Sequence, residues 1–141
     1  MFSKTFTTPY GDYQISNDSF VIQGHTIDGI TPSTYDPLKK VMSVSFDEDA
    51  KKAFADIVQS FNLCDVLKLN QFGERMGVYA NVNAKAVCYN LDKDVIDNVS
   101  GVIKIIFKVS RFKSKTGVIT AKVNVVALQQ VKAEDILTCP F

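Results

Sequence analysis

Residues 101–131 constrain the fold of this chain more than any other stretch. Two runs rich in β-branched and aromatic residues flank a short turn at residues 113–117, and this pattern predicts a long antiparallel β-hairpin. Alternation predicts that the apolar residues at odd positions 103–109 share one face of the first strand. The odd positions 121–127 are expected to do the same on the second strand.

The predicted hairpin is strongly basic. Between Asn98 and Ala133 there are seven Lys and Arg residues and no Asp or Glu, whereas the whole chain has a net charge of only +1. Binding of a polyanion would therefore depend on where the charge lies and not on its total. The seven residues are Lys104, Lys108, Arg111, Lys113, Lys115, Lys122 and Lys132.

The composition is that of a single soluble domain. The chain has 141 residues, of which 46% are hydrophobic and 22% charged, which is enough to build one core. Its three scattered cysteines fit neither a disulfide framework nor a paired-cysteine zinc site. The chain shows no signal peptide and no apolar run near the ~20 residues of a membrane span. We expect a cytoplasmic protein with no membrane contact, folded over residues 1–133, with a short tail at 134–141.

One amphipathic helix is predicted at residues 46–61. Apolar residues recur there at spacings of three and four, which indicates a helix packed on a sheet. Ser45 and Glu48 fit a capping box, with Ser45 as the N-cap residue.

A third strand is predicted at residues 77–89. Small apolar residues at even positions alternate there with polar and aromatic ones, among them Tyr79, Asn81, Lys85 and Tyr89. This strand and the hairpin would each present a face that mixes lysine, asparagine and aromatic side chains.

The residues needed for catalysis are sparse. His25 is the one histidine, and no glycine-rich phosphate loop is present. Asp92, Asp94 and Asp97 lack the glycine and distal glutamate of a calcium loop. We therefore expect no enzyme activity, no cofactor and no metal.

The basic hairpin has the chemistry that single-stranded nucleic acid requires. Proteins bind such strands with a positive groove for the phosphates and aromatic faces on which bases stack. Phe112 lies between Arg111 and Lys113, and Tyr79 and Tyr89 are on the strand expected beside them. The alternative is that the lysines and asparagines form the solvated face of a half-buried sheet. The absence of acids across the hairpin favours binding.

The end of the chain carries a resemblance. Glu134 and Asp135 precede an apolar segment that closes in Pro140 and Phe141. This is similar to the acidic tip of bacterial single-stranded DNA-binding proteins, which docks on replication partners. The hairpin also resembles the closing strands of phage-type single-stranded DNA-binding proteins of the oligonucleotide/oligosaccharide-binding (OB) fold, in its Gly101 to Lys108 run and its aromatic, basic turn ending in Gly117.

These observations predict a mainly β protein, an OB-like antiparallel β-barrel with one packed helix at 46–61 and the basic hairpin at 101–131. The resemblance implies non-catalytic, largely sequence-independent binding of single-stranded DNA in phage replication or recombination, in the host cytoplasm. RNA as a ligand, homo-oligomerisation and docking of replication proteins on the tail stay open. The rival hypothesis is a structural or protein-interaction protein of a virus or phage that uses the same sheet as an interface.

The residues expected to contact single-stranded DNA are Tyr79, Asn81, Lys85, Tyr89, Lys104, Lys108, Arg111, Phe112, Lys113, Lys115 and Lys122. The residues expected to contact a partner protein are Glu134, Asp135, Pro140 and Phe141.

Overall fold

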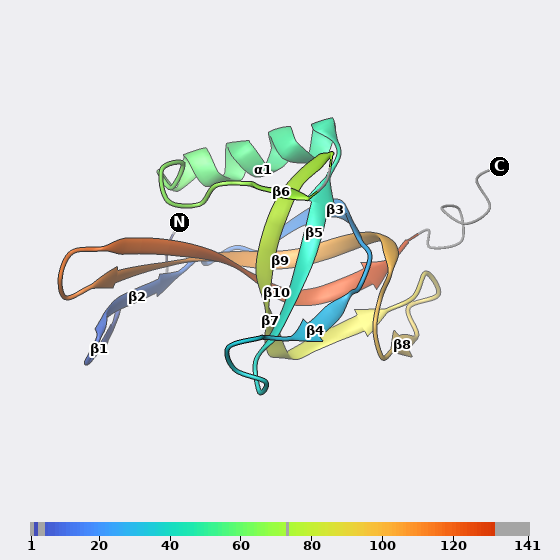
Figure 1. The fold of residues 1–141 in the computed structure, drawn as a ribbon, viewed down its shortest axis with the longest axis horizontal. Coiled ribbons are helices and arrows are strands. Elements are labelled where there is room, and N and C mark those ends of the chain that lie inside the picture. The colour runs from blue at the N-terminus through green and yellow to red at the C-terminus, as the bar shows by residue number, and fades with distance from the viewer. Residues whose placement is uncertain (1, 3–4, 73, 132–141) are drawn as a thin grey trace.

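The computed structural model describes residue 2 and residues 5–72 and 74–131. The described part is mostly β-structure with a single α-helix (Figure 1). In chain order the elements are β1 (Phe6–Thr8), β2 (Gly11–Ile15), β3 (Phe20–Thr26), β4 (Ile30–Pro32), β5 (Lys40–Phe46), α1 (Glu48–Ser60), β6 (Asn70–Phe72), β7 (Arg75–Tyr89), β8 (Val95–Ile96), β9 (Gly101–Ser114) and β10 (Ile119–Gln130).

Five of the strands form a closed ring. The order β9, β10, β7, β5, β3 returns to β9 through the β3–β9 pairing, and only the β7–β10 pair in this ring is parallel. Numbered 1 to 5 along the chain, these strands are arranged 1-2-3-5-4, which is the Greek-key connectivity of the OB fold. The prediction of an OB-like, mainly β fold with one packed helix is therefore confirmed.

The hairpin forms where the sequence places it. β9 and β10 pair in antiparallel register from Lys113–Ile119 to Ile103–Gln130, and Gly117 takes the positive φ of 91° in the turn. The residues at odd positions 103–109 share one face, as predicted, and that face is fully buried.

The expected alternation of β10 is wrong at its end. Val125 pairs with Phe107 but Ala127 pairs with Ile106, so Val126 is an extra residue that forms a β-bulge. The bulge shifts the side-chain pattern by one residue. Leu128 takes the core position, and Ala127 moves to the other face of the strand.

Helix α1 covers one side of the ring and completes the core (Figure 1). Its Phe54 is 2% exposed, and the ring centroid of Phe54 lies 6.2 Å from that of Phe107 in β9 and 5.3 Å from that of Phe46 in β5. Phe20 of β3 also packs on Phe107, with the ring centroids 5.9 Å apart. Aromatic contacts thus join the helix directly to β5 and β9, and through Phe107 to β3.

The start of α1 differs from the predicted capping box. Strand β5 continues through Phe46, and the hydroxyl of Ser45 donates to the His25 carbonyl at 3.2 Å. Ser45 is therefore part of the sheet and is not the N-cap residue. Asp47 has that role, since its Oδ1 accepts from the Ala50 backbone N–H at 2.8 Å.

The hairpin projects beyond the ring as an arm (Figure 1). β2 pairs with the outer half of β9, and β1 pairs with β2. Gly11 permits this close packing, because a Cβ at that position would collide with the Lys113 carbonyl. Across the described part of the chain, we find no helix with the length and apolar character required to cross a membrane.

The cap assignment predicts the effect of two substitutions. Asp47→Ala should lower the free energy of unfolding by about 0.5–2 kcal/mol, because the Ala50 N–H loses its acceptor, whereas Asp47→Ser should retain most of the stability. Urea denaturation followed by circular dichroism measures both. Equal stability of the Asp47→Ala variant and the unmodified protein would contradict the assignment.

Candidate functional site

A wide groove crosses the outer face of the ring. It has a volume of about 1130 Å³ and lies over β5, β7 and β10, between the loop of residues 33–39 on one side and β2 on the other. Its lining residues are Tyr13, Ile15, Thr31, Pro32, Ser33, Thr34, Tyr35, Asp36, Leu38, Lys39, Lys40, Val41, Met42, Ser43, Tyr79, Asn81, Val82, Asn83, Ala84, Lys122, Asn124 and Val126.

Strand pairing brings the polar residues of the groove floor together. Asn81 of β7 is in register with Asn124 of β10 and with Val41 of β5, and Tyr79 is in register with Ser43. Because side chains alternate along a strand, residues paired in this way share the outer face. The buried Val78, Ala80 and Val82 of β7 alternate with them.

Tyr79 offers an aromatic surface in the groove. Its side chain is 64% exposed, and Phe72 of β6 supports the ring edge to face, with the centroids 4.9 Å apart. Tyr13 lines the opposite side of the groove, where β2 places it in register with Phe112 of β9. Two aromatic side chains from distant strands thus flank the same channel.

The charge of the groove is positive. Lys39, Lys40 and Lys122 line it, and Asp36 is the one carboxylate among the lining residues. Asp36 has a structural role in the loop, because its Oδ1 accepts from the Leu38 N–H at 3.1 Å and its carbonyl from the Lys39 N–H at 2.9 Å. The same loop leaves Tyr35 98% exposed at the edge of the groove.

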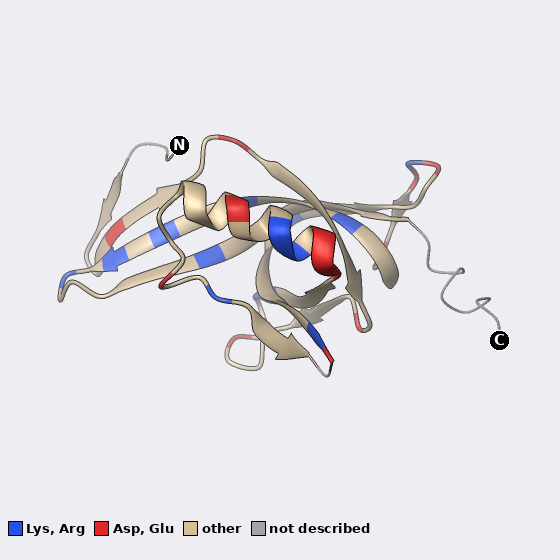
Figure 2. Ribbon diagram, turned by 90° about the horizontal axis from the view of Figure 1, so that it is seen from above, with Lys and Arg blue, Asp and Glu red and all other residues tan. Residues whose placement is uncertain are grey.

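The residues predicted to bind DNA lie at several different places in the fold. Three of them, Tyr79, Asn81 and Lys122, line the groove. Lys108 and Phe112 lie on the same face of the arm, since Lys108 is in register with Asn124 and Phe112 with Thr120 and Tyr13. Figure 2 shows the basic residues distributed along both strands of the arm and at its turn.

Arg111 and Lys113 lie on the opposite face of the arm. The Arg111 Nη1 donates to the Gln14 Oε1 at 3.2 Å, and Gln14 alternates with the groove residues Tyr13 and Ile15. Lys113 is in register with Asp12 of β2. The acidic residue Asp12 therefore lies beside the basic residues of the arm, although residues 98–133 themselves contain no acid.

The remaining predicted contacts lie apart from the groove. Lys104 and Tyr89 are both in register with Gln129, near the far end of β10. Lys85 lies where β7 loses its register with β10, and Lys115 is in the turn of the arm. The predicted tail residues, 134–141, lie outside the described residues.

Most of the groove residues were not assigned to binding from the sequence, and the aromatic and basic ones among them are Tyr13, Tyr35, Lys39 and Lys40. They come from the first third of the chain. Its strands pair with strands that lie about 40 to 100 residues later in the sequence, and its loop covers them. The one local signal was a loop rich in proline that also carries aromatic and basic side chains.

His25 is half-buried in β3, where it pairs with Ser45. Burial, together with the positive charge of Arg75, lowers the pKa of His25 below its ordinary value, so the ring is neutral at pH 7. Within residues 2, 5–72 and 74–131, no cluster of three or more His, Cys, Asp or Glu side chains could hold a metal ion.

Two solved structures share this fold. The single-stranded DNA-binding protein from bacteriophage Enc34 aligns with 92% of this chain and 89% of its own, at a TM-score of 0.52 and 11% identity. The structure of the single-stranded DNA-binding protein from bacteriophage Enc34 in complex with ssDNA aligns with 92% of this chain and 93% of its own, at a TM-score of 0.54 and 10% identity. No family model and no curated protein matches the chain. At such low identity the likeness shows the fold, which is the fold that the resemblance predicted.

Proposed function

We propose that this protein binds single-stranded DNA along the groove, without catalysis and largely without regard to sequence, in phage DNA replication or recombination. The observation that carries the proposal is the position of the groove. It lies over β5 and β7, the second and third strands of the ring, beneath the loop that joins the first strand to the second. OB folds bind oligonucleotides on that face and with that loop.

The lining supplies both kinds of contact that a single strand requires. Tyr79 and Tyr13 present aromatic faces on which bases can stack, and Tyr35 can close on the strand from the loop. Lys39 and Lys122 can neutralise phosphates. Asn81, on the floor, can donate a hydrogen bond to a base or a sugar, while its neighbour Asn124 can accept one through Oδ1, because its Nδ2 already donates to the Ser110 Oγ at 2.8 Å.

The arm can extend the binding surface beyond the groove, and we call the combined surface the proposed track. Lys108 and Phe112 lie on its groove face, so a strand leaving the groove past Lys122 would meet them next. The fold shared with a protein whose structure holds ssDNA supports this use of the sheet. Arg111 and Lys113, on the other face, are not part of the proposed track.

Stacking on Tyr79 can be measured against a matched tyrosine. Tyr79→Ala should weaken binding of oligo-dT about 5- to 150-fold, because one stacked base contributes ~1–3 kcal/mol. Tyr10→Ala is the control, since Tyr10 is 79% exposed in the β1–β2 turn and does not line the groove. Fluorescence anisotropy at low salt measures both. Equal losses for the two variants would contradict a stacking role for Tyr79.

The two faces of the arm provide a second comparison. Lys122→Ala should weaken oligo-dT binding and reduce the slope of log K against log salt by about 0.7, the value of one phosphate contact. Lys113→Ala removes the same charge from the other face and should leave the slope unchanged. A larger effect for Lys113→Ala would show that the strand follows the other face.

The rival function is a protein interface on the same sheet. If oligo-dT does not bind at low salt, and Tyr79→Ala instead changes self-association in analytical ultracentrifugation, the rival is favoured. Titration with DNA and RNA oligomers of equal sequence decides between the two nucleic acids, because only RNA carries the 2′-hydroxyl.

A further inference from the structure

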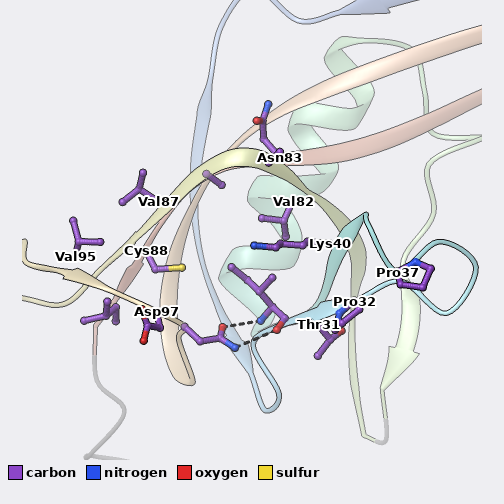
Figure 3. Close-up of a pocket in the computed structure, with 15 residues that line it drawn as sticks. Thr31, Pro32, Pro37, Lys40, Val82, Asn83, Val87, Cys88, Val95 and Asp97 are labelled. Atoms are coloured by element: carbon purple, nitrogen blue, oxygen red, sulfur yellow. Dashed lines mark hydrogen bonds between the residues drawn. The ribbon is translucent and has the colours of Figure 1, made fainter.

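A second cavity opens beside the groove. It has a volume of about 400 Å³ and lies between β4, β8 and the second half of β7 (Figure 3). We call it the side pocket. The residues that line both it and the groove are Thr31, Pro32, Lys40, Val82, Asn83 and Ala84. The two cavities are therefore neighbours across a shared wall.

The side pocket exists because β7 leaves the sheet for a few residues. Val82 is in register with Val125, but the next pair is Val87 with Ala127, so residues 83–86 of β7 arch away from β10. The far wall is fixed by Asn98, whose Oδ1 accepts from the Ile30 N–H at 2.8 Å and whose Nδ2 donates to the Ile30 carbonyl at 3.1 Å. Figure 3 shows both hydrogen bonds at the edge of the pocket.

The lining combines apolar walls with two opposite charges. Val82, Val87, Cys88 and Ile96 provide the apolar surface, and burial raises the pKa of the Cys88 thiol, which keeps it uncharged. The Lys40 and Cys88 side chains point toward one another across the cavity (Figure 3), and Asp97 lies at its edge.

The two charges are available to a ligand. Neither Lys40 nor Asp97 forms an ion pair with any residue that the structure describes, where the one such pair is Lys51 with Glu48. The amide of Asn98, by contrast, already forms hydrogen bonds to Ile30 through both Oδ1 and Nδ2. A ligand in the pocket would thus find one cationic donor and one anionic acceptor against an apolar surface.

We propose that the side pocket receives one base of the strand bound in the groove, and that guanine is the base it fits best; this rests on the proposed function. Guanine presents an acceptor, O6, beside two donors, N1–H and the N2 amino group. Lys40 can donate to O6, which is a common lysine contact, and the acceptor-only carboxylate of Asp97 can take the two donors. A phosphate suits the pocket less, because Asp97 would repel it.

Other bases match these charges less well. Adenine carries an amino group where guanine carries O6, so its donor would face the Lys40 ammonium. Thymine offers a single N–H, between two carbonyl oxygens, so one oxygen would face the Asp97 carboxylate. Extrusion of a base into a pocket costs least in a single strand, which has no pair to break.

The experiment uses the full chain and oligo-dT in which one thymine is replaced at each position in turn. With a single dG, at least one position should bind about five-fold or more tightly than all-dT, the lower bound for a well-placed base contact. Asp97→Asn should remove that gain, so that the dG oligomer and all-dT bind this variant equally. Asp94→Asn is the matched control and should keep the gain, because Asp94 is exposed on the other side of β8 and does not line the pocket.

Each outcome has a defined meaning. Failure of all-dT to bind overturns the proposed function, and with it this inference. Binding of all-dT without any gain from dG overturns the inference alone, as does a gain that persists in Asp97→Asn. An equal gain from dA would show that purine size is recognised and would overturn the assignment of guanine.

Discussion

Strand β9 buries one face in the core and is paired along both of its edges. Ile103, Ile105, Phe107 and Val109 are all 0% exposed. One edge of β9 pairs with β10, while the other pairs first with β3 and then with β2. At the junction between these partners, the Ser16 N–H donates to the Val109 carbonyl at 2.8 Å, and the Ser16 hydroxyl accepts from the Val109 N–H at 3.0 Å. The ring closes because one strand satisfies its backbone on both edges along its whole length.

That constraint also decides which charges can act together. Since alternate residues of β9 and β10 are committed to the core, only the others reach the groove face, and the Val126 bulge sets where this pattern changes. Lys108 and Phe112 therefore share a face with Tyr79 and Lys122, whereas Arg111 does not. The basic residues of the hairpin are divided between its two faces. Neither face therefore carries as much positive charge as their density in the sequence suggests.

The sequence allowed much of the fold to be predicted, because the relevant signals are local. Alternation defined the hairpin, and helical spacing defined α1 to within two residues of its observed ends. The N-cap residue of α1 was assigned wrongly because strand β5 continues through Ser45. That continuation depends on the pairing of β5 with the distant strand β7. Most of the groove lining was missed, in large part for the same reason. Tyr13, Tyr35 and Lys40 reach it only through closure of the ring, which no window of the sequence displays.

The measurement that tests the central claim most directly is the mapping of amide chemical-shift changes in a ¹⁵N-labelled sample as oligo-dT is added. If single-stranded DNA lies in the groove, the largest changes should fall on residues 79–83, 33–40 and 120–124, and the amides of α1 should change little. The strands of the floor and the loop that covers it would then respond together, although they are far apart in the chain. Changes concentrated on α1 or on the outer edge of β1, with the groove unaffected, would contradict the account.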